Sequence, residues 1–261
     1  MMLVALASAA CTQVATDPNA VVAVRFDGSA YPSIVAGDSL RDSLGALQPL
    51  KATGLNYKDE PVPGVLFVFS SPDTILRMFK DGVVFARGRK TDGAPARVFA
   101  TLGSLPSTPD TLFVVPRADS IKAVKDVDTL GVGTTGNAST GVETPRPIQF
   151  SLFGDTLRGA PKAPVQAWLV SFQLHYRGTP LPPTDTSKAY TFVISGSGAT
   201  ARLIPTFVDS TDASGKAERG VFVKSVPANV AEDTIFLVAT ARARKAGVAP
   251  ISDTTMILLR R

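Results

Sequence analysis

Hydrophobic and polar side chains alternate along several short segments of the chain. The clearest is VSFQLHYR at 170–177, where apolar residues occupy every second position and polar residues fill the others. Because successive side chains of a strand point to opposite faces, this segment predicts a strand with one buried side and one solvent-facing side. Such a strand is typical of an antiparallel sheet.

Comparable apolar segments recur along the chain and are separated by turns rich in Gly, Pro, Asp and Ser. We predict strands at 22–26, 65–69, 98–101, 147–152, 170–177, 190–194 and 235–240. No amphipathic segment of helical period extends beyond about two turns. Short strands spaced by about 8–12 residues are typical of a β-sandwich.

Four short sequences occur twice, in the same order, in the two halves of the chain. The pairs are GDSLR at 37–41 with GDTLR at 154–158, the Tyr-to-Pro segments 57–63 and 176–182, FVFS at 67–70 with FVIS at 192–195, and DTLFVV at 110–115 with DTTMIL at 253–258. Self-similarity in a fixed order indicates repeated structural units. We therefore predict two domains of one kind in tandem.

Part of the first half also resembles a known family. The segments that carry the resemblance are GDSL at 37–40, PVPG at 61–64, VFSSP at 68–72, DGVVFA at 81–86 and PARVFA at 95–100. In this order they resemble a bacterial immunoglobulin-like (Ig-like) domain of the Big type. The resemblance implies extracellular or periplasmic β-sandwiches that act as spacers, adhesive modules or carbohydrate-contacting units. It transfers no fixed set of functional residues.

The predicted fold class is all-β, with two tandem Ig-like β-sandwich domains. The expected organisation is a signal segment and polar tether over 1–20, a first domain over 21–116, a linker over 117–145 and a second domain over 146–261. The linker rests on TLGVGTTGNASTG at 129–141, because Gly, Thr and Ser suit a flexible connection. A strand or short turn over 120–127 stays open.

The chain begins MMLVALASAAC, an apolar stretch far shorter than the about 20 residues that span a bilayer. Such a segment indicates a secretory signal. Ser8 to Cys11 resembles the lipobox of bacterial lipoproteins, in which a peptidase cuts before a cysteine that carries lipid. The resemblance implies that Cys11 is the lipid-attachment residue and that its acyl chains anchor the protein to a membrane. A plain secretory signal cut after Ala9 and a bland apolar N-terminus remain alternatives.

Cysteine count and charge restrict the remaining classes. Cys11 is the only cysteine, so the mature fold contains no disulfide and no cysteine-based zinc site. The net charge is +5, but the basic residues are scattered and lack interleaved aromatics. Together with export, this argues against a nucleic-acid partner. We expect the protein in the cell envelope, at the outer membrane or anchored to the cell surface.

Three candidate chemical sites have simpler interpretations. The glycines of GVGTTG at 131–136 match a dinucleotide fingerprint, but prolines at 145 and 147 leave no room for the required helix. His175 is the only histidine and falls on the polar face of its predicted strand. The acids of VDSTDASGKAE, at 208–218, favour a hairpin turn, with calcium as the alternative. We predict no catalytic residue, no cofactor and no metal, with a hydrolase as the least favoured hypothesis.

The preferred function is a non-enzymatic envelope lipoprotein that acts as a surface spacer or protein-interaction module. The alternative is an adhesin-like protein that contacts glycans or a partner protein through loops of the second domain. The candidate loops are Thr184–Lys188, Thr211–Arg219 and Ala243–Pro250, because loops carry function on such scaffolds. We interpret Arg242–Lys245 as a solvated loop, with a binding patch for an anionic polymer as the alternative. We interpret Trp168 as a core residue.

Overall fold

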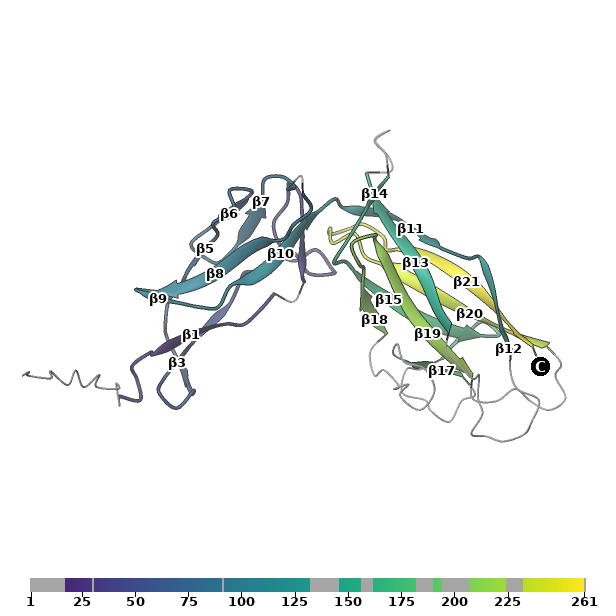
Figure 1. The fold of residues 1–261 in the computed structure, drawn as a ribbon, viewed down its shortest axis with the longest axis horizontal. Helices are drawn as coiled ribbons and strands as arrows, with labels where there is room; N and C mark the ends of the chain where they lie inside the picture. The colour runs from purple at the N-terminus through teal and green to yellow at the C-terminus, as the bar shows by residue number, and fades with distance from the viewer. Residues whose placement is uncertain are drawn as a thin grey trace, which may run out of the picture.

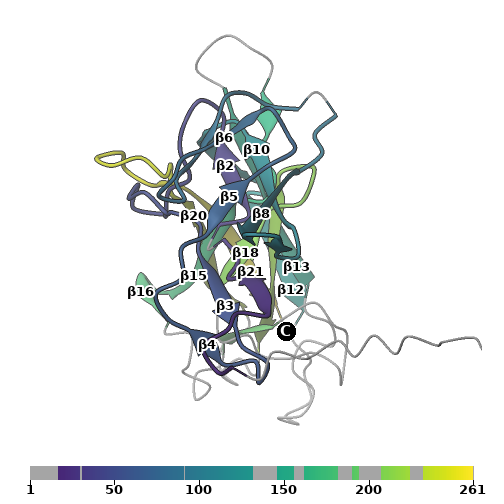
Figure 2. The ribbon, with the colours of Figure 1, turned by 90° about the vertical axis from the view of Figure 1, so that its left-hand side faces the viewer.

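The computed structural model describes residues 17–29, 31–90, 92–131, 146–155, 162–181, 190–193, 207–223 and 232–260. These residues form strands, turns and loops, and no helix occurs among them. In the described part of the chain, therefore, no helix is long and apolar enough to span a membrane. The strands gather into two domains that follow one another along the long axis of the molecule (Figure 1), so the first overlies the second in the end-on view of Figure 2.

The described residues of the first domain form ten short strands. They are β1 (Ala23–Phe26), β2 (Ser33–Val35), β3 (Ala52–Leu55), β4 (Pro61–Val62), β5 (Val68–Ser70), β6 (Leu76–Met78), β7 (Val84–Ala86), β8 (Ala96–Leu102), β9 (Leu105–Pro106) and β10 (Asp110–Val115). One sheet has the order β1-β3-β4, and another has the order β2-β10-β8-β5 with β9 attached to β8. Strands β6 and β7 form a separate hairpin.

The second domain has longer strands. They are β11 (Ala118–Ala123), β12 (Val127–Gly131), β13 (Arg146–Gly154), β14 (Ala163–Pro164), β15 (Leu169–Tyr176), β16 (Thr179–Pro180), β17 (Tyr190–Val193), β18 (Val208–Ser210), β19 (Lys216–Val223), β20 (Glu232–Ala241) and β21 (Ile251–Arg260). The two sheets have the orders β11-β13-β19-β17 and β12-β21-β20-β15-β16, with β14 and β18 attached at the side.

Strand order identifies both domains as Ig-like sandwiches. In the second domain, four strands of one sheet face the β15-β20-β21 sheet, which is the arrangement of Ig-like domains. In the first domain, β2 pairs in parallel with β10, as β12 does with β21. The orders β2-β10-β8-β5 and β12-β21-β20-β15 also agree in direction. The predicted all-β fold with two tandem Ig-like sandwiches is confirmed.

The segment predicted as a linker, 117–145, contains the first two strands of the second domain. β11 pairs with β13, and β12 pairs with β21. Each strand buries few apolar side chains, among them Ile121 and Leu130. The alternation of apolar and polar residues therefore extends over only a few positions in each strand. The Gly- and Thr-rich composition that suggested a linker belongs mainly to residues after Gly131, and 132–145 lie outside the described residues. The strand at 147–152, expected to open the domain, is instead its third.

The sequence repeats correspond to the structural repeat only in part. DTLFVV lies in β10 and DTTMIL in β21, which are equivalent last strands. By contrast, Gly37 follows β2 whereas Gly154 ends β13. Residues 68–70 form β5, and the described residues of the second copy, 192–193, end β17. The first Tyr-to-Pro segment follows β3, and the second begins at Tyr176, the last residue of β15. Such turn sequences suit the end of any strand, so they recur at different turns of the same fold.

The strongly alternating strand lies where its pattern predicts. In β15, Val170, Phe172 and Leu174 are buried, whereas Ser171 on the opposite face is exposed. Trp168 is 1% exposed and belongs to the same core, as predicted. The second-domain core also includes Val35 and Val115, which come from the first domain. Apolar packing therefore continues across the boundary between the domains.

Candidate functional site: the junction between the domains

The turn between β20 and β21 places a buried arginine between the two domains. Arg244 is 2% exposed, although it belongs to a segment of mostly exposed residues. Its Nε and Nη2 atoms donate to the carbonyl oxygen of Arg41 at 3.0 and 2.6 Å. Its Nη1 donates to the carbonyl oxygen of Ser33 at 2.7 Å and to the Ser33 hydroxyl at 3.2 Å. Every acceptor belongs to the first domain.

Two aromatic rings, one from each domain, accompany this guanidinium. Its central carbon lies 4.5 Å from the ring centroid of Tyr31 and 5.1 Å from that of Trp168. Burial lowers the pKa of Arg244 to about 10, so the side chain is still a cation at neutral pH. Among the described residues, no carboxylate forms an ion pair with it. Carbonyl oxygens and aromatic faces therefore stabilise this buried charge.

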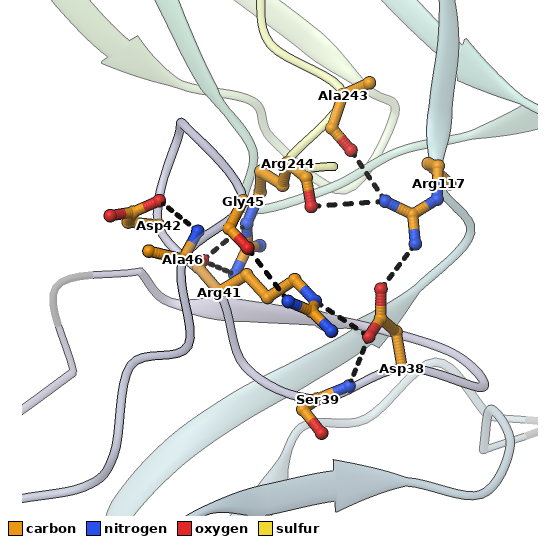
Figure 3. A network of polar contacts seen from close by, with 9 residues as sticks. All are labelled: Asp38, Ser39, Arg41, Asp42, Gly45, Ala46, Arg117, Ala243 and Arg244. Atoms are coloured by element: carbon orange, nitrogen blue, oxygen red, sulfur yellow. Dashed lines mark hydrogen bonds and ion pairs between the residues drawn. The ribbon is translucent and has the colours of Figure 1, made fainter. Parts of the chain in front are cut away.

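A second arginine joins the domains where the chain passes from β10 to β11. Arg117 donates from Nη2 to Oδ2 of Asp38 at 2.6 Å and from Nη1 to the carbonyl oxygen of Ala243 at 2.8 Å (Figure 3). Asp38 Oδ1 also accepts from Nε of Arg41 at 2.9 Å. Burial alone would raise the pKa of Asp38, but the hydrogen bonds from Arg41 and Arg117 lower it below its ordinary value of 3.8.

A glycine allows the two facing turns to approach closely. A Cβ atom built on Gly45 would lie 2.4 Å from the backbone nitrogen of Ala246, and Gly45 has a φ of +93°. Its carbonyl oxygen accepts from Nη1 of Arg41 at 2.8 Å. Asp42 fixes the same loop by accepting from the backbone N–H of Ala46 at 2.9 Å (Figure 3). The loop is therefore shaped to fit the β20–β21 turn.

Further polar contacts extend the junction. The Ser33 hydroxyl donates to the carbonyl oxygen of Ala167 at 2.7 Å in a buried position. At the rim, Nε2 of Gln166 donates to the carbonyl oxygen of Gly93 at 3.0 Å, and Arg89 lies 3.6 Å from Asp155. Because the joint has a buried centre and a polar rim, the two domains form one continuous unit.

The predicted lipid-attachment residue, Cys11, lies outside the described residues. Gly131 ends β12, and the rest of the GVGTTG segment also lies outside them. His175 is half-buried in β15 opposite Pro180. Within the described ranges, no three His, Cys, Asp or Glu side chains lie close enough together to hold a metal ion.

The acidic segment forms the hairpin turn that its sequence predicts. Oδ1 of Asp212 accepts the backbone N–H groups of Ser214 and Lys216 at 2.8 and 2.9 Å. Asp209 instead lies 3.0 Å from Arg219 in an ion pair. These carboxylates therefore stabilise the turn and the strands beside it.

The structure corrects the interpretation of the last candidate loop. Residues 243–250 were a candidate contact loop under the alternative function, and Arg242–Lys245 were interpreted as solvated. Arg242 and residues 245–250 are indeed exposed, but Arg244 is buried against the first domain. The loop at 184–188 lies outside the described residues. Sequence reasoning missed Arg244 because the local sequence of a turn does not distinguish a buried arginine from a solvated one. Its role depends on the close approach at Gly45, which lies 199 positions earlier.

Comparisons with known proteins add little to this description. Searches of family models and of curated proteins find no match. Among solved structures, the Yersinia pseudotuberculosis adhesin InvE is 17% identical over 88% of this chain and 57% of the adhesin chain, with a TM-score of 0.36. A Drosophila N-cadherin fragment, EC1-3, is 11% identical over 91% and 67% of the two chains, with a TM-score of 0.31.

The chain thus spans just over half the length of the matched adhesin chain. A PapD-like domain of human CEP192 is also similar, at 9% identity over 56% of this chain and 87% of that one, with a TM-score of 0.31. The Ig-like assignment rests on the strand order and not on these likenesses. The narrower resemblance to the Big type stays a prediction.

Proposed function

We propose that the chain is a non-enzymatic envelope protein whose two Ig-like domains form a stiff surface spacer or protein-interaction module. The observation that carries this proposal is the buried junction around Arg244. Four hydrogen bonds and two aromatic contacts fix the guanidinium in one place. Because those contacts require one relative orientation of the domains, they favour a rod over a flexible pair. A spacer needs such stiffness to hold its outer end at a set distance.

Contacts at the start of the first domain support attachment at the end of that domain that lies away from the junction. Asn56 is 3% exposed, and its Nδ2 donates to the carbonyl oxygen of Pro18 at 3.0 Å. Asp17 accepts the backbone N–H of Asn19 through its Oδ1 at 2.8 Å, which closes a turn just before the first domain. In the proposal, the residues between Cys11 and this turn are the tether. Lipid on Cys11 then places the first domain next to the membrane and the second domain farther out.

Labelling with radioactive palmitate tests the anchor. The full chain is expressed in a bacterium that processes lipoproteins, and the membrane fraction is assayed for label. We expect Cys11→Ser to lose the label and to leave the membrane fraction. Ser8→Leu is the matched control, because it alters the same segment, keeps the cysteine and restores the Leu that lipoboxes usually carry at this position. Equal labelling of the Cys11→Ser protein contradicts the anchor.

A further inference from the structure

Beside the junction, a cleft of about 270 Å³ opens between the domains. The second domain contributes Leu169 and Ser171 from β15, Thr240 from β20 and Arg242 just after that strand. The first domain contributes Tyr31 and Ser43. The volume is just below the usual range for ligand pockets, about 300–1,000 Å³, so the cleft suits only one small ligand.

The polar groups of the second-domain wall lie on the outer face of its sheet. Ser171 pairs directly with Thr240 on one side and with Val208 on the other. Val170 and Ala241, which alternate with these residues, are buried in the core. The outer face therefore presents two hydroxyls side by side, next to apolar side chains.

These hydroxyls have no partner within the described part of the chain. The side chains of Ser43, Ser171 and Thr240 form no hydrogen bond with any described residue. Each hydroxyl both donates and accepts, so together they match a ligand that carries several hydroxyls of its own. The neighbouring Leu169 and Val208 offer apolar surface, which suits the C–H face of a sugar ring.

Arg242 adds a positive charge to the cleft. Its guanidinium is exposed and forms no ion pair with any described carboxylate. Its backbone is held in place, because Nε1 of Trp168 donates to its carbonyl oxygen at 3.1 Å. A guanidinium recognises a planar carboxylate with two parallel hydrogen bonds. Arg244, by contrast, is fully used in the junction, so Arg242 is the cation left for a ligand.

We propose that this cleft binds a carboxylated sugar of monosaccharide size, a hexuronate unit of an acidic glycan. The hydroxyls of Ser43, Ser171 and Thr240 bind the sugar hydroxyls, and Arg242 binds the carboxylate. Arg244 also lines the cleft, but its guanidinium is already hydrogen-bonded to Ser33 and Arg41. One exposed guanidinium among several neutral hydrogen-bonding groups favours a sugar acid over a densely charged phosphate ligand. Because both domains line the cleft, binding depends on the junction staying closed.

Amide chemical shifts of the full chain carrying Cys11→Ser test the proposal, with sodium D-glucuronate as the probe. We expect saturable shifts at Ser171, Thr240 and Arg242. D-glucose lacks the carboxylate and inorganic phosphate lacks the ring, so each should bind at least tenfold more weakly. No saturable shift with glucuronate overturns the proposal, and so does equal binding of phosphate, which would indicate a simple anion site. Equal binding of glucose overturns the role of the carboxylate.

Substitutions in the cleft distinguish ligand binding from the stiffness of the two-domain unit. Arg242→Met should weaken glucuronate binding at least tenfold, whereas Lys245→Met, an exposed cation on the same turn, should leave it unchanged. Ser171→Ala should weaken binding by a smaller factor. The distance between spin labels on the two domains should stay constant in Arg242→Met, so a loss of binding reports on the cleft and not on domain stiffness. Unchanged affinity in Arg242→Met contradicts the assignment.

Discussion

Truncation of Arg244 should uncouple the two domains. In Arg244→Ala, the carbonyl oxygens of Ser33 and Arg41 lose their donors in a buried junction. An unsatisfied buried acceptor costs about 2 kcal/mol. The contacts with Tyr31 and Trp168 contribute about 1 kcal/mol each, as partly desolvated cation–π pairs do.

Removal of the buried charge acts in the opposite direction. Burial lowers the pKa of Arg244 from its ordinary value to about 10, which corresponds to about 3 kcal/mol of unfavourable charge burial that the truncated protein no longer carries. The net expected loss is therefore about 3 kcal/mol of coupling between the domains.

Differential scanning calorimetry measures this coupling. The wild-type chain should unfold in one cooperative transition, whereas Arg244→Ala should show two, the first about 10 °C lower. Lys245→Ala is the matched control, because it removes an exposed cation from the same turn. A single transition in Arg244→Ala, within about 2 °C of the wild type, would refute the view that Arg244 holds the domains together.

Two further predictions concern the same junction. Gly45→Ala should lower the first unfolding midpoint much as Arg244→Ala does, because its Cβ would meet the backbone of Ala246. Gly103→Ala, which also has positive φ but nothing within 4 Å of the added carbon, should have a smaller effect, and equal effects would count against a close approach. Acid should loosen the joint, because the folded pKa of Asp38 lies below 3.8: its contribution is complete above that value and is lost as the pH falls through the folded pKa. In the wild-type chain, the spread of interdomain distances should therefore widen as the pH falls towards 3. In Asp38→Asn, the distance distribution should be broad already at pH 7. Equal spreads of the wild-type chain at pH 7 and pH 3 would argue against this role of Asp38.

Alternation and turn chemistry were sufficient to predict the fold class. In β15, every second residue is apolar, so its length, its face and the burial of Trp168 follow directly. The first domain is harder to predict, because β5 and β6 have only three residues each and a period of two scarcely shows. A strand over 120–127 had stayed open, and β11 occupies part of that range. The strand β12 was hidden by the Gly- and Thr-rich residues that begin within it and follow it.

The junction was beyond the reach of sequence reasoning for a different reason. The contacts of Arg244 join residues separated by 203 and 211 positions along the chain. No local pattern links such positions, and a buried arginine in a turn has the same composition as a solvated one. Only the relative placement of the two domains brings Arg244 to Ser33 and Arg41. The repeated turn sequences predicted the duplication of the domain, although the two copies of most repeats lie at strands that are not equivalent in the two domains.

Spin labels on the two domains test whether the chain is one stiff unit. Cys11→Ser removes the only native thiol, and Thr111→Cys and Thr254→Cys place labels on exposed positions of β10 and β21. We expect one narrow distance distribution for this protein at pH 7 and a clearly broader one when Arg244→Ala is added. A broad distribution in the protein with Arg244 intact would show that the two domains do not form a stiff unit.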